Sequence, residues 1–595
     1  MVGKKEDNKV PPVNGKAQAS RKSLKRFDLL RFAFIVLVVV LVNLLGQRFY
    51  TRLDLTAEKR YTLSKPTRQL IRDLDDVVFF KVYLEGDFPA GFKQLSRATR
   101  EMLDEFRAVS DKIEYEFINP SASNDVKIRN QVYRQLSEKG LVPTTLQVRE
   151  KDGSAQRIIF PGALVTYKGR EVALPLLQSQ IGVAPEQVLN NAVKSLEYNL
   201  ANAIRKLSQG LKPKLAVLEG YGQLPDTRLW DGMTALNEFY SVERIVLGES
   251  LGSLAERVYN EDSTEVRVRN KYAVVIIPKP TQAWSEKDKF ILDQFIMRGG
   301  KVLWMIDAVV ADMDSLQAQP EMVSVARDVN LGDMLFRYGV RVNPDLLMDM
   351  RAMPIPVKTG QIGDQPQFEF YPWYYMPLIA SQTNHPAVVN LNASRFEFVS
   401  SIDTVESEGV RKTVLLETSA YTRVSPSPAY VTLEILKKEP DQKMFPDGPR
   451  AVAVLLEGEF TSLFRNRIPP EIEADPGIGY RDMSLPTRMI VLSDGDVFSN
   501  QVSPGTRTPL PLGYDQYTGE TLGNRDLLLN LVNYLTDESG LIQIRSRELR
   551  LRTLDQARVN AEKNRWQVIN VLIPVLLVIL FGLGAGFLRK RRYSR

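Results

Sequence analysis

Three short segments carry the side chains best placed to do chemistry, because each directly follows an apolar stretch typical of a buried strand. They are Glu219-Gly220-Tyr221-Gly222-Gln223, Met305-Ile306-Asp307 and Ser493-Asp494-Gly495-Asp496. In open α/β sheets, ligands bind beyond the carboxyl ends of the strands, where such segments meet. The candidate ligand-binding residues are therefore Glu219, Tyr221, Gln223, Asp307, Asp494 and Asp496.

Asp494 and Asp496 could hold a hard cation through their carboxylate oxygens. No further carboxylates follow them at the spacing of a calcium loop. An Asp-Gly-Asp segment after a strand is more often a turn stabilised by the Asp side chains. Cysteine is absent and His385 is the single histidine, which excludes thiolate and histidine-rich metal sites. We predict no metal site and no cofactor.

The sequence does not support catalysis. Gly220 and Gly222 could approach a phosphate, but Glu219 beside them would repel it, and no P-loop or dinucleotide-binding pattern follows any strand. A Ser-His-Asp triad could use only His385, and the chain lacks a Gly-x-Ser-x-Gly elbow. We predict no catalytic residue. A hydrolase that uses Glu219, Asp307, Asp494 or Asp496 remains an alternative, and it requires these acids to share one pocket.

Residues 212–540 alternate apolar strands with amphipathic helices. This alternation predicts an α/β domain with a mostly parallel, Rossmann-like sheet that is covered on both faces. Residues 351–427 interrupt the pattern with prolines, short strands and the aromatic run Phe370-Tyr371-Pro372-Trp373-Tyr374-Tyr375. We interpret them as a β-rich insertion or an elaborated edge. The aromatic run would form a binding face or, more commonly, pack in a core.

Residues 61–180 follow the order β-α-β-α-β-β, which looks like a thioredoxin-type domain. Without cysteine the domain cannot carry a redox Cys-x-x-Cys, so the likeness would be architectural only. The spacing of apolar residues within 184–210 predicts a connector helix that packs in the core between the two domains.

Apolar segments near both ends predict membrane anchors at residues 29–50 and 567–588. A helix of about 20 apolar residues spans a bilayer. The tails 1–28 and 589–595 are rich in Lys and Arg, which favours a cytoplasmic position for both termini. A cleaved signal peptide is the alternative for the first segment, but its basic region is long and no small-x-small site follows. Within the second anchor, Gly582 and Gly586 form a GxxxG pattern that lets another helix pack closely.

The net charge of the chain is +7, and the two tails hold more than this excess. The part between the anchors is therefore near neutral or slightly acidic, which argues against nucleic-acid binding. Residues 545–566 are charged and mostly helical in pattern. We interpret them as a stalk helix that continues into the second anchor.

Four stretches resemble the GldG family, the auxiliary components of gliding-motility-associated ABC transporters in Bacteroidetes. They are RLDLTAEKRYTLS, EGDFPAGFKQLSRATREMLDEF, NNAVKSLEYNLANAIRKL and NRDLLLNLVNYLTDESGLIQIRSRELRLRTLD, and the likeness extends over essentially the whole chain. The resemblance implies an ABC permease and a cytoplasmic ATPase as partners. It also implies a GATase-like exported domain, whose nucleophilic Cys is absent here. Family members often read Glu-Gly-His-Gly-Glu at residues 219–223, and this departure weakens any catalytic role at that turn.

The resulting hypothesis is a non-catalytic, membrane-anchored subunit of an ABC-type transporter complex in the inner (cytoplasmic) membrane. Both termini would be cytoplasmic and the large domains periplasmic. The alternatives are a membrane-tethered extracytoplasmic hydrolase and a cell-envelope scaffold without a transporter.

Overall fold

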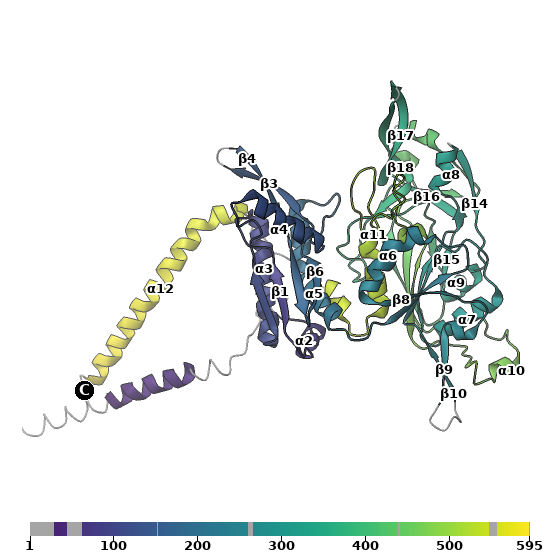
Figure 1. The fold of residues 1–595 in the computed structure, drawn as a ribbon. Helices are drawn as coiled ribbons and strands as arrows, with labels where there is room; N and C mark the ends of the chain where they lie inside the picture. The colour runs from purple at the N-terminus through teal and green to yellow at the C-terminus, as the bar shows by residue number, and fades with distance from the viewer. Residues whose placement is uncertain are drawn as a thin grey trace, which may run out of the picture. The chain divides into compact units, whose positions relative to one another are not determined.

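The computed structural model describes residues 29–43, 62–150, 153–259, 266–319, 321–363, 365–437, 441–546 and 556–593. Residues up to Thr62 form one compact unit and residues from Leu63 onward form a second. The chain is a mixed α/β protein with several separate sheets (Figure 1).

The first α/β region begins with a helix that the sequence caps locally. The hydroxyl of Ser64 accepts a hydrogen bond from Thr67 N, and Pro66 occupies the first turn. A four-stranded sheet follows in the order β2-β1-β5-β6. β1 pairs parallel with β2, whereas β5 pairs antiparallel with both β1 and β6. The bounds are α2 Lys65–Arg72, β1 Val78–Val82, α3 Ala90–Val109, β2 Ile113–Phe117, α4 Val126–Glu138, β5 Gly162–Tyr167 and β6 Arg170–Pro175.

The predicted β-α-β-α-β-β order is present. A hairpin of β3 (Thr144–Glu150) and β4 (Gly153–Ile159) forms its own two-stranded sheet between α4 and β5. The connector helix is α5 (Pro185–Ser208), which contacts α2, α3 and the segment Leu541–Ser546. Its buried residues include Leu196, Leu200 and Leu207, as the helical spacing predicted.

A seven-stranded sheet in the order β21-β24-β25-β12-β11-β7-β8 organises the larger α/β region. The five strands from β25 to β8 are parallel, and β24 and β21 add antiparallel at one edge. The bounds are β7 Lys214–Glu219, α6 Asp226–Phe239, β8 Ser241–Val246, β11 Val274–Pro278, α7 Glu286–Met297, β12 Lys301–Met305, α9 Gly332–Tyr338, β21 Val410–Glu417, β24 Ala451–Gly458, β25 Thr487–Leu492 and α11 Asn524–Thr536.

Successive residues of the central strands enter two different cores. Along β11, Val274 and Ile276 pack with residues of α6 and α11, whereas Val275 and Ile277 pack with residues of α7 and α9. Both faces of the sheet are therefore shielded from water, which explains why every residue of β11 is buried and none is polar. The predicted parallel sheet with two covered faces is present.

Smaller elements surround this sheet. They are η1 Leu251–Ser253, β9 Ala255–Tyr259, β10 Val266–Asn270, β13 Val309–Val310, α8 Met313–Ala318, β14 Glu321–Ala326, β15 Val340–Val342, β16 Asp345–Asp349, β17 Ala352–Ile362, β18 Gln365–Ile379, β19 Ser394–Arg395, β20 Ile402–Thr404, β22 Thr422–Pro426, β23 Ala429–Thr432, η2 Leu433–Lys437, η3 Gln442–Met444, α10 Pro470–Glu473, η4 Asp496–Phe498 and η5 Leu541–Ser546.

The predicted insertion at residues 351–427 is only partly separate from the main sheet. Its long hairpin β17–β18 lies apart from the sheet, but β21, from the same stretch, is the edge strand of the sheet. The aromatic run divides along β18. Phe370 is exposed, whereas Trp373, Tyr374 and Tyr375 are buried in a core of their own. Core packing is thus the main role of the run.

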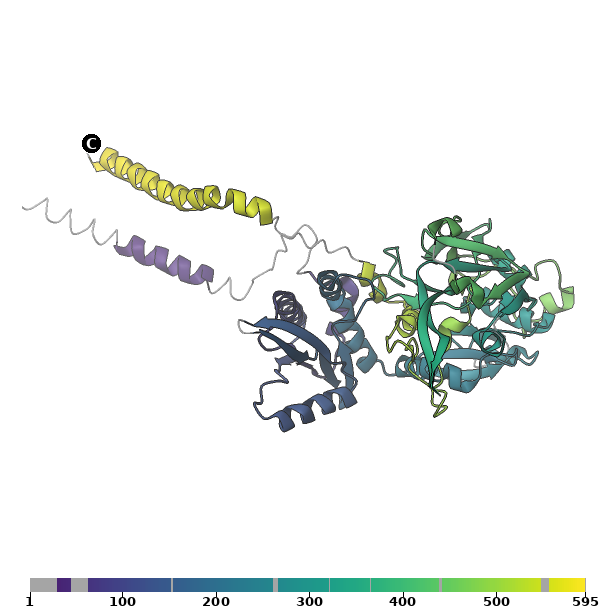
Figure 2. The same ribbon diagram turned by 90° about the horizontal axis from the view of Figure 1, so that it is seen from above.

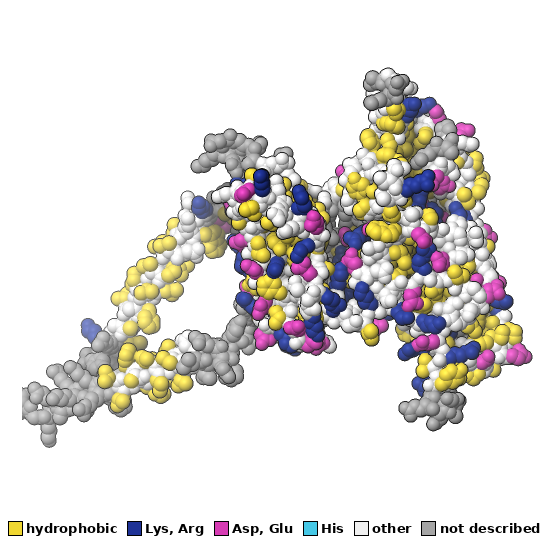
Figure 3. Space-filling view, in the orientation of Figure 1, with side chains coloured by type: hydrophobic (Ala, Val, Ile, Leu, Met, Phe, Trp, Pro, Cys, Tyr) yellow, Lys and Arg dark blue, Asp and Glu magenta, His cyan; other side chains and the backbone are white. Residues whose placement is uncertain are grey.

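The two predicted anchors differ in how much of each is described. Of residues 29–50, a helix over Leu29–Asn43 is described, which is shorter than a bilayer span, and residues 44–50 lie outside the described residues. α12 (Gln556–Tyr593) is one continuous helix that contains Pro574 (Figure 2). Its segment Ala561–Leu588 is long and apolar enough to cross a membrane. Hydrophobic side chains cover both helices in Figure 3.

The predicted stalk at 545–566 is described only in part. Arg545 lies in η5, residues 547–555 lie outside the described residues, and α12 begins at Gln556. From there the helix continues without a break into the apolar segment, as predicted. The tail 1–28 lies outside the described residues.

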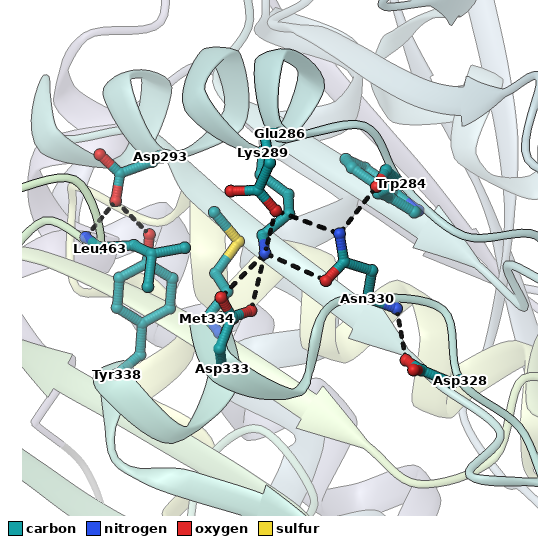
Figure 4. Close-up of polar contacts among 10 residues, drawn as sticks. All are labelled: Trp284, Glu286, Lys289, Asp293, Asp328, Asn330, Asp333, Met334, Tyr338 and Leu463. Carbon is teal, nitrogen blue, oxygen red and sulfur yellow. Dashed lines mark hydrogen bonds and ion pairs between the residues drawn. The ribbon is translucent and has the colours of Figure 1, made fainter. Parts of the chain in front are cut away.

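Buried polar groups tie α7 to its neighbours (Figure 4). Nζ of Lys289 is fully buried and lies 2.9 Å from carboxylate oxygens of Glu286 and Asp333. One turn further on, Asp293 accepts hydrogen bonds from Tyr338 Oη (2.8 Å) and Leu463 N (2.9 Å). The hydroxyl of Ser462 donates to the same carboxylate at 2.6 Å.

Replacing Asp293 by Ala should therefore destabilise the larger region, because three buried donors would lose their acceptor. A buried donor left unsatisfied costs about 1–3 kcal/mol, so the expected total loss is about 3–5 kcal/mol. Thermal unfolding of the detergent-solubilised chain, followed by tryptophan fluorescence, measures it. Glu471→Ala, at an exposed position of α10, is the control and should leave the melting temperature unchanged. An unchanged melting temperature in Asp293→Ala would contradict the assigned role.

Candidate functional site

The carboxyl ends of three neighbouring parallel strands converge on a buried cluster of charges. Lys279 follows β11, Asp307 lies two residues after β12, and Asp494 and Asp496 follow β25. Nζ of Lys279 lies 3.1 Å from Oδ2 of Asp307 and forms a shorter ion pair with Asp496. We name Lys279, Asp307, Asp494 and Asp496 the strand-end cluster. It brings together three of the six predicted ligand-binding residues.

Asp494 holds the turn that carries the acids. Its Oδ1 accepts a hydrogen bond from Asp496 N, and its Oδ2 accepts one from Glu397 N, both at 2.6 Å. Gly495 N donates to Oδ1 of Asp307 at 2.6 Å. The Asp-Gly-Asp segment is therefore a turn stabilised by Asp side chains, as the sequence favoured.

Gly495 is required by the close approach of the lysine. A Cβ at this position would lie 2.3 Å from Cβ of Lys279, which no real side chain tolerates. Lys279 itself has a φ of 49°, in the left-handed region. The close packing of Lys279 against Gly495 places the lysine ammonium group beside the acids of the turn.

The strand-end cluster also binds residues from the predicted insertion. Nε of Arg395 lies 3.1 Å from Oε1 of Glu397. Asn524, at the start of α11, accepts a hydrogen bond from Arg395 N (2.9 Å) and donates one to Arg395 O (2.8 Å). The polar network thus joins the sheet, residues 395–397 and α11.

Burial controls the protonation of the acids. It raises the pKa of Asp494 well above its ordinary value, and the charges of Asp496 and Asp307 raise it further. Burial also raises the pKa of Asp307, against the opposing effect of Lys279. For Lys279, burial alone would lower the pKa, but the charges of Asp307 and Asp496 outweigh burial, and the pKa is raised.

The chemistry open to this arrangement is limited. Lys279 stays protonated and cannot serve as a base or as an amine nucleophile. The side chains of Lys279, Asp307 and Asp496 are between 8% and 11% exposed, and Asp494 is fully buried. The acids therefore face a lysine rather than an open pocket, which favours structure over hydrolysis.

The remaining predicted residues lie in a different environment. Oε2 of Glu219 forms an ion pair with Nη2 of Arg244 at 2.7 Å. The Tyr221 ring stacks on Trp284 with centroids 4.2 Å apart, and Gln223 Oε1 accepts a hydrogen bond from Tyr221 N at 2.8 Å. Each contact stabilises the turn, and none of them involves a residue of the strand-end cluster. Glu219 is paired with Arg244 and the other acids are held beside Lys279, which disfavours the alternative hydrolase.

The single histidine, the possible metal ligands and the two glycines of the GxxxG pattern complete the set of predicted residues. The His385 ring packs on Tyr534, and its Nδ1 accepts a hydrogen bond from Ala387 N at 3.3 Å. Among the described residues, no three carboxylates or imidazoles are arranged to hold a metal ion. Gly582 and Gly586 lie in α12 with open space around their Cα atoms.

The residues missed by sequence reasoning are Lys279, Arg395 and Glu397. Lys279 had a usable signal, because it is a charge between two prolines directly after a fully apolar strand. Arg395 and Glu397 had none, since they lie in an irregular stretch far from the strands that they contact.

A cavity of 510 Å³ lies in the first α/β region, at the carboxyl ends of β1 and β2. Its charged lining residues are Asp87, Arg129 and Arg157, and Asp87 is paired with Lys93 at 2.9 Å. The mixed charge of this cavity does not select a ligand class.

Comparison with protein families decides the wider assignment. A family model described as an ABC-type uncharacterized transport system matches residues 212–531, more than half of the chain. The chain belongs to this family. It is a transporter-associated auxiliary protein, and the matched stretch spans the seven-stranded sheet and the strand-end cluster. A second model, for a domain of unknown function, matches residues 57–166.

Relatives of this transport-system protein are distant. An uncharacterized protein of Borreliella burgdorferi is 19% identical over 552 residues, covering 91% of this chain and 94% of the relative. The N-terminal domain of mmIFT52 is 12% identical, covering 54% of this chain and 97% of that structure, with a TM-score of 0.28. A thua-like protein from Parabacteroides merdae is 11% identical, covering 55% and 90%, with a TM-score of 0.24. The two structural scores are too low to support an argument.

Replacing Lys279 by Met should destabilise the protein more at about pH 8 than at about pH 5. The folded-state pKa values of Asp307 and Asp494 lie above 3.8, so the stability due to these acids is greatest in acid and falls as pH rises through the raised values. Without Lys279 the acids must ionise without a counter-charge. Melting temperatures across this pH range measure the effect.

Lys287→Met is the matched control, since Lys287 is 73% exposed beside Glu249. Its effect should be small at every pH. A pH-independent loss in Lys279→Met would show that the lysine contributes packing rather than charge compensation.

Proposed function

We propose that the chain is a non-catalytic, membrane-anchored extracytoplasmic subunit of an ABC-type transporter complex, of the GldG type. The observation that carries the proposal is the family match over residues 212–531 together with the apolar helix that follows in the same chain. In this arrangement α12 holds the α/β regions at the membrane. An ABC permease and a cytoplasmic ATPase supply transport and energy.

The strand-end cluster supports a non-catalytic role. Its acids are enclosed and compensated by Lys279, whereas a hydrolase needs an acid or base within reach of substrate. The flavodoxin-like strand order β8-β7-β11-β12-β25 in the parallel part of the sheet and the β-α-β order of the first region support GATase-like and thioredoxin-like architectures. Both would serve here as binding scaffolds.

α12 is suited to couple these regions to the membrane. It is one helix from Gln556 to Tyr593, so a movement at its first turns would be transmitted along the helix. Gly582 and Gly586 lie four residues apart on one face, where a permease helix could approach closely. We propose that this face binds the permease.

Copurification in mild detergent tests the assembly. A tagged full-length chain should recover a multi-span permease and an ATPase. Gly586→Leu should reduce their recovery, because the larger side chain blocks close helix packing. Gly584→Leu, two residues away and on another face, is the matched control. Recovery of a stable complex without an ATPase would favour a cell-envelope scaffold instead.

Cysteine labelling tests the topology, since the chain has no natural cysteine. A membrane-impermeant maleimide should label Glu471→Cys in intact spheroplasts. Ser20→Cys and Arg591→Cys should react only after permeabilisation, because both termini are proposed to be cytoplasmic. Labelling of Ser20→Cys in intact spheroplasts would contradict the first membrane span while leaving α12 as an anchor.

A further inference from the structure

A second polar site lies at the opposite edge of the seven-stranded sheet, where β11 and β12 begin. A cavity of 340 Å³ is lined there by residues of β10, the end of α7 and the loop before β25. Four of its lining residues are cations and one is an acid, which are Arg269, Arg298, Lys301, Arg481 and Glu538. A volume of this size is at the lower end of the range for small-molecule sites.

The cations are only partly neutralised by the protein around them. Glu538 is the acid nearest to Lys301, at 3.6 Å, and its side chain is 86% exposed. Arg269 pairs with Glu256, but no described residue forms an ion pair or hydrogen bond with the guanidinium of Arg481. The cavity therefore keeps a positive excess.

Arg298 has a buried donor that lacks an acceptor. Its Nε donates to Oδ1 of Asn270 at 3.1 Å, whereas its Nη1 is buried without a hydrogen-bond partner among the described residues. Leaving a buried donor of a charged group unpaired is costly, and such groups normally find an acceptor. An anion in the cavity would provide one.

The protonation of these groups points the same way. Burial is the main cause that lowers the pKa of Arg298 to about 10; the charge of Asp293 opposes the lowering and that of Arg481 adds to it. Burial also lowers the pKa of Lys301, an effect to which Arg488 adds and which Glu538 and Asp537 oppose. Buried cations whose pKa values are lowered in this way would be stabilised by a bound anion.

The end of α7 opposes an anion here less than an uncapped helix end would. Helix C-termini disfavour negative charge through their unpaired carbonyls, but these carbonyls have donors. Phe295 O accepts from Gly300 N and Asn270 Nδ2, Ile296 O from Gly299 N, and Met297 O from Leu485 N. The side chains of Arg298, Lys301 and Arg481 therefore determine the charge of the cavity.

We propose that this cavity binds a phosphate monoester, held by Arg298, Lys301 and Arg481. Two guanidinium forks and one ammonium group match the several oxygens and the double charge of such a group. The phosphate could belong to a soluble metabolite or to the headgroup of a lipid. The site is separate from the strand-end cluster and does not depend on the transporter assignment.

Calorimetric titration of the full chain in maltoside detergent tests the proposal. The probes are glycerol 3-phosphate, glycerol as the neutral control, and dioctanoyl phosphatidic acid in mixed micelles. Arg298→Gln, Lys301→Gln and Arg481→Gln should each weaken phosphate binding about tenfold, because each removes a charge-assisted hydrogen bond. Added salt should weaken binding as well.

Arg411→Gln is the matched control, since Arg411 is 75% exposed and pairs with Glu457 outside the cavity. It should bind the probes as the natural chain does. Arg481 is exposed, so its variant keeps the test valid if Arg298→Gln fails to fold.

Each outcome has a defined meaning. Binding of glycerol 3-phosphate that depends on the three cations supports a soluble monoester. Binding of phosphatidic acid alone, with the same dependence, supports a lipid headgroup. The proposal is overturned if neither probe binds, or if the three variants leave binding unchanged. It is also overturned if only an acidic peptide, and neither phosphate probe, binds in a way that requires these cations.

Discussion

The ion pairs of Lys279 are the interaction on which the larger α/β region most depends. A parallel sheet with two dry faces leaves its strand ends in a crowded, poorly solvated place, and this sheet ends three adjacent strands with Lys279, Asp307 and the Asp494–Asp496 turn. Isolated charges there would be unfavourable, since removing each ion from water costs on the order of several kcal/mol of free energy. Because the three strand ends meet, the positive charge of Lys279 compensates the negative charges of Asp307 and Asp496. The turn after β25 and Glu397 are then held by backbone hydrogen bonds to the same acids. The side chain of Asn524, at the start of α11, donates in turn to the backbone carbonyl of Arg395.

The two edges of the sheet differ in how far their charges are compensated. At the carboxyl edge, acids outnumber cations, yet their side chains are enclosed and point at one another. At the amino edge, Arg298, Lys301 and Arg481 face a cavity with little opposing charge. In an auxiliary subunit of a transport system, the first edge is suited to rigidity and the second to recognition. The usual expectation for open α/β sheets places ligands at the carboxyl edge, and here that edge is occupied by the protein's own side chains.

The division fits a protein that works through its position rather than through chemistry of its own. The turn at Glu219-Gly220-Tyr221 is held by the Arg244 ion pair and by stacking on Trp284. The aromatic run in β18 is used mainly to fill a core. α12 provides an apolar segment of 28 residues in the same polypeptide. Family membership and architecture therefore agree on an auxiliary role, with binding surfaces carried by a rigid scaffold.

The sequence by itself determined the features that depend on local or periodic patterns. Alternating strands and helices predicted the parallel sheet, and the apolar run after Trp566 predicted the helix that can cross a membrane. Ser64 and Ser285 cap their helices through hydrogen bonds to residues three positions on, a strictly local pattern. Only the tertiary structure decided which distant residues meet. Lys279 and Asp496 are 217 positions apart, and Glu397 has no strand-end signal at all. Likewise, β21 joins the main sheet although its surroundings resemble an insertion, because an edge strand needs only one partner with free backbone groups. Such contacts depend on where loops converge in space, and no periodicity along the chain encodes that convergence.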